Sequence, residues 1–307
     1  MKTFHSIQEF NCRNHTVVTI GTFDGVHKGH ESIIKNLVQN TSKSNYESVL
    51  LTFFPHPRII LNQEENIKLL NTLKEKIIIL ENLGVNNLII QPFTKEFSQL
   101  SANDFVEQVL VNKLKCKKII VGYDHRFGNN REASVKELIE FGNKFNFDVE
   151  EISAKQIKEI SISSTKIRNA LLQGNVEDAN NYLGYPYSLS GKIVKGKQVG
   201  RTINFRTANI EIDENYKLIP KEGVYAVKVF IKNKEHLGMM NIGKNPTVNL
   251  QKQSVEVHIF NFDEDIYNEN IKVTLFNYLR EEKKFSDLMA LQNQLTKDKI
   301  QALNLLQ

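Results

Sequence analysis

The sequence lacks the features that define several protein classes. It has no Trp and only two Cys among 307 residues. Cys12 and Cys116 stand far apart, without a CxxC pair or a histidine-rich partner, so a disulfide scaffold and a zinc module are both disfavoured. The first residues form no apolar leader, and no apolar run approaches the ~20 residues of a membrane span. We therefore expect a soluble protein of the reducing cytoplasm that has no membrane partner.

The charge balance also excludes an obvious polyanion-binding surface. Forty Lys and Arg oppose 35 Asp and Glu, a formal net charge of +5. The basic tracts at residues 113–118 and 283–284 are short, so we interpret them as solvated faces and expect no nucleic-acid partner. A mild positive bias still suits small anions such as nucleotides. The hydrophobic content of 40% is that of a globular chain, and the length suits two domains.

In the first half, short β-rich runs alternate with amphipathic stretches. The runs predicted as strands are 16–20, 48–54, 88–90, 118–121 and 147–152, and the helices are 29–39, 69–80, 102–114 and 134–145. This alternation predicts an α/β domain, with an open, mostly parallel, doubly wound sheet covered by helices on both faces. Ligands of such sheets bind beyond the carboxyl ends of the strands.

After Gly184-Tyr185-Pro186 the pattern changes to short alternating runs separated by turns. The expected strands are 187–194, 208–212, 223–230, 238–242, 254–260 and 271–276, followed by a helix over 285–305. Six short strands and a terminal helix predict a small antiparallel barrel. We therefore divide the chain into domains 1–184 and 185–307.

The segment GTFDGVHKGH, residues 21–30, follows the first predicted strand and opens a helix. Backbone N–H groups and the helix dipole favour a phosphate at this position. A lone histidine at a helix start is more often a cap, but His27 and His30 flank Gly29 and together favour phosphate handling. GxxxxGK[ST] is absent from the sequence. The pattern suits attack on an α-phosphate with pyrophosphate leaving, without a covalent intermediate.

Three further motifs are candidates for the same site. His56 lies between two prolines in TFFPHP, which fits a rigid turn as well as a ligand. Ser164 and Thr165 in ISSTKIR open a helix whose hydroxyls and cations indicate either an ordinary N-cap or a second anion clamp. The motif GYDHRFG follows the fourth strand and can supply Asp124 and Arg126 to the same cleft.

These motifs, in this order, resemble the bacterial bifunctional riboflavin kinase/FAD synthetase family over essentially the whole chain. The resemblance implies a Rossmann-like nucleotidyltransferase domain followed by a riboflavin kinase barrel with a terminal helix. It implies catalytic roles for His27, His30 and Arg168. It also implies ATP or phosphate binding by Gly21, Phe23, Gly29, His56, Ser164 and Thr165, and flavin binding by Asp124 and Arg126.

The C-terminal half resembles the kinase module of the same family through GKIVKG (191–196), TAN (207–209), EVH (256–258) and LREEKKF (279–285). The resemblance implies that Thr207 and Asn209 hold Mg²⁺ and ATP phosphates. It places Gly196 at the ATP, makes Glu256 the base for the ribityl 5′-hydroxyl, and assigns Arg280 to the flavin. Taken by itself, Glu256 reads as an exposed residue of an alternating strand.

One loop departs from the family pattern, because Asn204-Phe-Arg206 stands where the family has Gly-Phe-Pro. Losing proline makes the loop costlier to order, by about 0.4–1 kcal/mol. We therefore expect a kinase with weakened ATP affinity that is still active.

The expected function has two ATP-dependent steps. Riboflavin is phosphorylated to FMN, and FMN is adenylylated to FAD with release of pyrophosphate, with Mg²⁺ implied in both. Two alternatives remain at this point: a single-activity FAD synthetase with an impaired barrel, and a non-catalytic flavin- or RNA-binding regulator. The sequence leaves the oligomeric state open.

Overall fold

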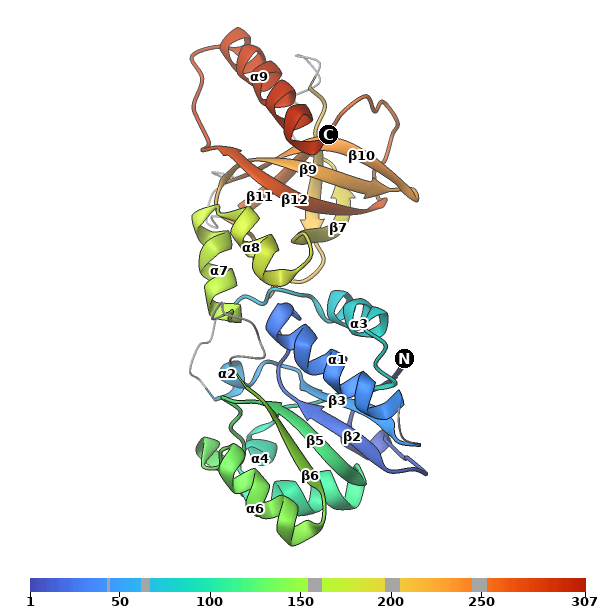
Figure 1. The fold of residues 1–307 in the computed structure, drawn as a ribbon. Helices are drawn as coiled ribbons and strands as arrows, with labels where there is room; N and C mark the ends of the chain where they lie inside the picture. The colour runs from blue at the N-terminus through green and yellow to red at the C-terminus, as the bar shows by residue number, and fades with distance from the viewer. Residues whose placement is uncertain (43–44, 62–66, 154–161, 197–204, 245–252) are drawn as a thin grey trace. The chain divides into compact units, whose positions relative to one another are not determined.

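A computed structural model of the chain describes residues 1–42, 45–61, 67–153, 162–196, 205–244 and 253–307. These residues form two compact units, Met1–Ser163 and Ser164–Gln307 (Figure 1). None of the helices that the structure describes is long and apolar enough to cross a membrane. Cys12 and Cys116 are both free thiols buried in the first unit.

The N-terminal unit is built on a parallel sheet. Its strands are β1 (Lys2–Phe4), β2 (Thr16–Ile20), β3 (Glu47–Phe53), β4 (Asn87–Gln91), β5 (Cys116–Gly122) and β6 (Asp148–Ile152). They lie in the order β1-β4-β3-β2-β5-β6, and every neighbouring pair is parallel. The central strand β2 is buried at all five positions, which explains its uninterrupted run of apolar and Thr residues.

Helices cover both faces of this sheet. Val17 of β2 packs with Ile33 and Leu37 of α1 (Lys28–Ser42), and Leu50 of β3 packs with α1 and with α3 (Leu73–Asn82). Val18 faces the other way, toward helix η2 (Phe105–Lys113) and helix α6 (Val135–Phe145). Successive residues of one strand thus face opposite layers, and the expected doubly wound α/β fold is confirmed.

Two of the expected helices differ from the prediction. Helix α3 begins at Leu73, not at Leu69, because Thr72 and Glu75 form a capping box that fixes its start. The stretch 102–114 is a short α-helical turn, α5 (Ala102–Asp104), continued by the π-helix η2. Apolar spacing does not distinguish these windings. The short elements η1 (Ile7–Glu9), α2 (Pro57–Ile60), α4 (Lys95–Ser98) and η3 (Asn129–Arg131) were not predicted.

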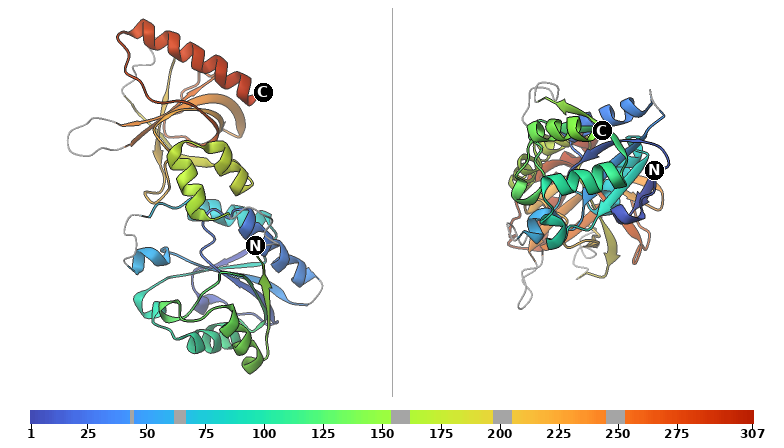
Figure 2. Two further views of the ribbon diagram at one scale, coloured as in Figure 1. Left: turned by 60° about the vertical axis from the view of Figure 1, so that its left-hand side comes forward. Right: turned by 90° about the horizontal axis from the view of Figure 1, so that it is seen from below.

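The second unit is a closed antiparallel barrel. Its strands are β7 (Ser188–Val194), β8 (Ala208–Ile212), β9 (Gly223–Ile231), β10 (Lys234–Lys244), β11 (Gln253–Ile259) and β12 (Asn270–Arg280), in the order β10-β11-β8-β7-β12-β9. Helix α9 (Leu288–Leu306) packs on β9, β10 and β12 (Figure 2). The six predicted strands and the terminal helix are confirmed. Most of their ends lie within three residues of the prediction, but β10 begins four residues earlier and β12 ends four residues later.

Two helices precede the barrel and belong to its unit. They are α7 (Ser164–Gln173) and α8 (Val176–Leu183). The Asn180 amide of α8 donates to the Leu275 carbonyl of β12 (2.9 Å), and the backbone N–H of Lys221 donates to the Leu171 carbonyl of α7 (3.0 Å). The boundary near residue 185 stays a prediction about where the two catalytic modules meet.

Candidate active sites

The loop that joins β2 to α1, residues 21–27, presents the two predicted histidines. We call it the β2–α1 loop. Three of its residues have positive φ: Phe23 (46°), Gly25 (83°) and Val26 (35°). Glycine adopts such values freely, but a β-branched residue rarely does. The loop ends at His27, whose carbonyl accepts from the N–H of Glu31 at 2.8 Å. This is the first helical hydrogen bond of α1.

His27 and His30 lie against each other at the start of α1. Their rings stack with centroids 3.7 Å apart and planes 16° apart, and the Phe23 and His30 rings form a T-shaped pair with centroids 5.1 Å apart. The backbone N–H of His30 donates to Nδ1 of His27 at 3.4 Å, so the His27 ring caps the helix. Since Nδ1 accepts this hydrogen bond, the ring proton sits on Nε2 and is available to a ligand.

Burial keeps both imidazoles neutral. It is the main cause that lowers the pKa of His27 to about 4, against the opposing charges of Asp24 and Asp124. The pKa of His30 is also lowered, by burial first, then by the repulsion that would arise if His27 were protonated too, and by the charge of Lys76. Nδ1 of His30 is buried and has no hydrogen-bond partner among the described residues. A neutral donor pair at a helix N-terminus is suited to phosphate oxygens.

The other predicted residues of this unit lie in the loops that follow β2, β3 and β5 and in the first turn of α1. A Cβ on Gly122 would lie 3.3 Å from Oδ1 of Asp124 and 3.5 Å from Ile33 of α1, so the loop after β5 lies beside the helix that His30 opens. Arg126 is exposed in the same loop. Nδ1 of His56 accepts from the backbone N–H of Arg58 at 3.2 Å and caps α2, which satisfies the rigid-turn interpretation of its motif. Gly21 donates its N–H to the Leu51 carbonyl at the end of β2, and Gly29 is buried in the first turn of α1.

The second predicted clamp lies on the other unit. Ser164, Thr165 and Arg168 occupy the first two turns of α7. They therefore share the helix start that the motif predicts.

Sequence reasoning missed two residues next to the histidines. Asp24 is 1% exposed and accepts hydrogen bonds from the backbone N–H groups of Leu70 (2.9 Å) and Asn71 (3.4 Å). Lys76 of α3 is 6% exposed and donates from Nζ to the Thr22 carbonyl at 2.7 Å. Asp24 sits inside the recognised motif, but no local pattern reveals that a lysine 52 positions later is buried beside it.

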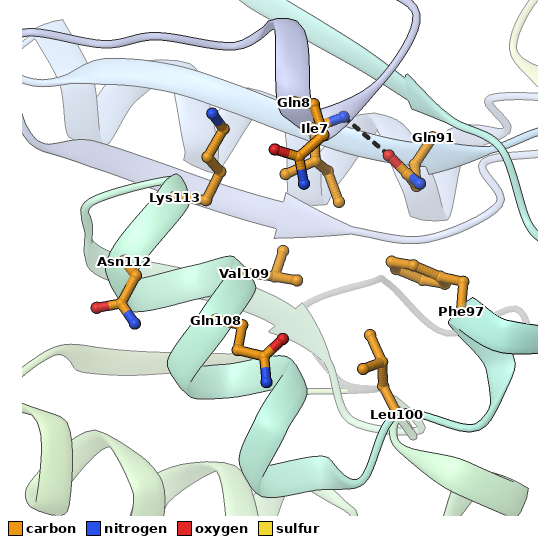
Figure 3. Close-up of a pocket in the computed structure, with 9 residues that line it drawn as sticks. All are labelled: Ile7, Gln8, Gln91, Phe97, Leu100, Gln108, Val109, Asn112 and Lys113. Carbon is orange, nitrogen blue, oxygen red and sulfur yellow. Dashed lines mark hydrogen bonds between the residues drawn. The ribbon is translucent and has the colours of Figure 1, made fainter.

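A separate cavity of about 330 Å³ opens between η1, β4 and η2 (Figure 3). Amide side chains and one lysine surround an apolar floor; its lining is Ile7, Gln8, Gln91, Phe97, Leu100, Gln108, Val109, Asn112 and Lys113. None of these residues is in the predicted site. The lining offers few charges for a phosphate chain, so this cavity is not the triphosphate site.

In the barrel, the predicted kinase residues do meet. Glu256 of β11 lies directly opposite Asn209 of β8. The Thr207 hydroxyl donates to Oε2 of Glu256 at 3.1 Å. A Cβ on Gly196 would come within 2.0 Å of Nδ2 of Asn209, so only glycine leaves that amide in place. These hydroxyl, amide and carboxylate oxygens form a group of the kind that Mg²⁺ takes together with phosphate oxygens.

Arg280, predicted at the flavin, and Arg206, in the loop that departs from the family pattern, both have protein partners. Arg280 donates to Asp298 of α9 through Nε (2.9 and 3.0 Å) and Nη2 (2.7 Å), and this carboxylate is 1% exposed. Its predicted role in flavin binding stays untested. Arg206 forms an ion pair with Asp263 and accepts at its carbonyl from His258. Asn204, the other departure in that loop, lies outside the described residues.

Known proteins match both halves of the chain. The family model for FAD synthetase matches residues 9–166, and that for riboflavin kinase matches residues 183–306. A bifunctional riboflavin kinase/FMN adenylyltransferase from Buchnera aphidicola subsp. Schizaphis graminum is 38% identical, over 97% of this chain and 96% of the relative. The chain belongs to the bifunctional riboflavin kinase/FMN adenylyltransferase family. The family resemblance inferred from the motifs is confirmed.

A second relative of this family, from Listeria monocytogenes, is 39% identical over 92% of this chain and 90% of its own length. A solved structure from Streptococcus pneumoniae, titled a macrolide-efflux protein, has a TM-score of 0.90 at 30% identity and covers 98% of each chain. The match covers both units, so a chain with this sheet domain followed by this barrel has a solved counterpart. Because both enzyme domains are present, the chain is a riboflavin kinase and an FMN adenylyltransferase, and the single-activity alternative is disfavoured.

Proposed function

We propose that His27 and His30 bind the phosphates of ATP and stabilise the transition state in which AMP passes to FMN. A phosphate oxygen of FMN attacks the α-phosphorus, the bond from that phosphorus to the bridging oxygen breaks, and pyrophosphate leaves. Charge accumulates on the phosphate oxygens, so preorganised N–H donors lower the barrier. The stacked, neutral histidine pair at the start of α1 is the observation that supports this assignment.

In the barrel, we assign Glu256 as the general base of riboflavin phosphorylation. It takes the proton of the ribityl 5′-hydroxyl while that oxygen attacks the γ-phosphorus, and ADP leaves. The Thr207 hydroxyl bonded to Glu256 holds the carboxylate in place. Thr207 and Asn209 would hold Mg²⁺, and that ion would neutralise charge on the phosphates when bound.

Ser164, Thr165 and Arg168 form a second ATP phosphate clamp at the start of α7, and Asp124 and Arg126 bind the flavin. The adenylyltransferase module spans residues 1–184 and the kinase module residues 185–307. The enzyme acts in the cytoplasm on small-molecule substrates.

Two variants, one in each site, test the two assignments when both activities are measured for each. His30→Ala should lower FAD formation from FMN and ATP by roughly a hundredfold, the scale of losing one preorganised donor, and should leave riboflavin phosphorylation nearly unchanged. Glu256→Gln keeps the size and polarity of the side chain but removes the base, so FMN formation should fall by ~10²-fold while FAD formation from supplied FMN persists. Equal loss of both activities in either variant would contradict the assignment.

A further inference from the structure

Lys76 is a charged side chain in a position that normally excludes charge. It belongs to α3, is 6% exposed, and its ammonium reaches across to the Thr22 carbonyl at 2.7 Å. Burying an ammonium is unfavourable unless it is paired and hydrogen-bonded. Its charge partner is Asp24, which is 1% exposed and stabilises the charged form of Lys76. Asp24 belongs to the β2–α1 loop itself, so the pair joins α3 to the loop that carries the histidines.

The β2–α1 loop needs such support. Phe23 and Val26 have positive φ values of 46° and 35°, which non-glycine residues adopt at a cost in conformational energy. A strained backbone persists only where its surroundings determine it. The Thr22 carbonyl accepts from Lys76 and also from the Thr52 hydroxyl at 3.1 Å, so the loop is tied at its start to both α3 and β3.

Asp24 ties the middle of the same loop. Its carboxylate accepts from the backbone N–H groups of Leu70 and Asn71, in the segment just before α3. Lys76 and Asp24 therefore connect the loop to one neighbouring region at two residues, Thr22 and Asp24, which flank Phe23. Any shift of Lys76 would be transmitted to Phe23, whose ring contacts His30.

We propose that Lys76 is a positioning residue for adenylyl transfer, whose ammonium holds the Thr22 carbonyl and, with Asp24, keeps the β2–α1 loop in the conformation that presents His27 and His30. The inference rests on the proposed function of the two histidines. Lys76 does not touch the reacting atoms; it acts through the loop.

The test compares Lys76→Met with Lys74→Met in the full-length enzyme. Met keeps the length of the side chain but removes its charge and donor, and Lys74 is an exposed lysine of the same helix. We expect Lys76→Met to lower kcat for FAD formation by roughly 10- to 100-fold, with a smaller change in KM for ATP, because the reacting groups are misplaced and not lost. Riboflavin phosphorylation in the same preparation, and both activities of Lys74→Met, should stay within about twofold of the wild type.

The pH dependence of FAD formation distinguishes positioning with charge from simple packing. Lys76 is one of the groups that disfavour protonation of His30; His27 acts in the same direction, and Asp24 and Asp124 favour protonation of the neighbouring His27. Removing the Lys76 charge should therefore move the acidic limb of the pH–rate profile to higher pH. Lys76→Arg keeps the cation, so its acidic limb should coincide with that of the wild type. Its kcat should lie between those of the wild type and Lys76→Met.

The outcomes separate the two levels of inference. If His30→Ala retains full FAD formation, the proposed function of the histidines fails, whatever Lys76 does. If His30→Ala is impaired but Lys76→Met has wild-type kcat and an unmoved acidic limb, the role of Lys76 is overturned. Should Lys76→Met fail to fold, a folded Lys76→Gln, which also lacks the charge, takes its place: wild-type kcat with an unmoved acidic limb would overturn the role of Lys76, and a lowered kcat with the limb at higher pH would support it.

Discussion

Replacing His125 by Phe should make the N-terminal unit less sensitive to acid. His125 lies in the loop after β5, where its ring stacks on Phe127 with centroids 5.9 Å apart. Burial is the main cause that lowers its pKa from 6.5 to about 4, helped by the charge of Arg131 and opposed by Asp124. Phe preserves the stacking and removes the titrating group.

The sign and size follow from proton linkage. Between pH 6.5 and 4 the unfolded chain binds a proton at His125 that the folded chain does not, so stability is full above pH 6.5 and is lost as the pH falls through that window. From pH 7 to pH 5 the loss at this one residue is about 2 kcal/mol. His27, whose pKa is also lowered to about 4, contributes a similar loss that the variant retains.

The two cysteines provide an assay specific to this unit. Cys12 and Cys116 are the sequence's only thiols, and both are buried in the N-terminal unit. Urea unfolding followed by their reaction with a disulfide reagent, sampled in short pulses at a common labelling pH, therefore reports on that unit alone. The stability lost between pH 7 and pH 5 should be smaller in His125→Phe than in the wild type by about 2 kcal/mol. An equal loss of stability in both proteins would refute the reasoning. Since His15 is exposed, His15→Phe serves as the control for replacing a histidine at the surface.

Two further predictions concern the barrel. Gly196→Ala should force the Asn209 amide aside, because the new Cβ would lie 2.0 Å from Nδ2. We expect KM for ATP in riboflavin phosphorylation to rise roughly tenfold, with FAD formation from FMN unchanged. An unchanged KM would show that Asn209 is not part of the ATP site. Arg280→Met leaves Asp298 buried without its cation, so the barrel should lose about 3–5 kcal/mol of stability in thermal or urea unfolding. A raised KM for riboflavin at unchanged stability would instead assign Arg280 to the flavin.

The sequence predicted those parts of the fold whose cause is local. Period-2 and helical patterns located both domains, and the strand–helix position of GTFDGVHKGH located the histidine pair. The start of α3 was misplaced although its capping box, Thr72 with Glu75, is visible in the sequence. Apolar spacing outweighed the cap in that assignment.

Long-range partners could not be predicted in the same way. Lys76 and Asp24 are separated by 52 positions, and only the packing of α3 beside the β2–α1 loop brings them together. Arg280 stands in a recognisable motif, but its carboxylate partner is on the terminal helix. A motif identifies which residue is present; the tertiary contacts decide what its charge faces.

Among the residues that the structure describes, the parallel sheet, unlike the closed barrel, ends in two edge strands that pair on one side only. One edge is β1, only three residues long, and the other is β6, where Asp148 and Glu151 are exposed. A second molecule presenting the same β6 edge would set carboxylates against carboxylates, which disfavours strand pairing between copies. The short edge strand β1 and the negatively charged edge strand β6 thus protect the folded protein from aggregating through its own sheet.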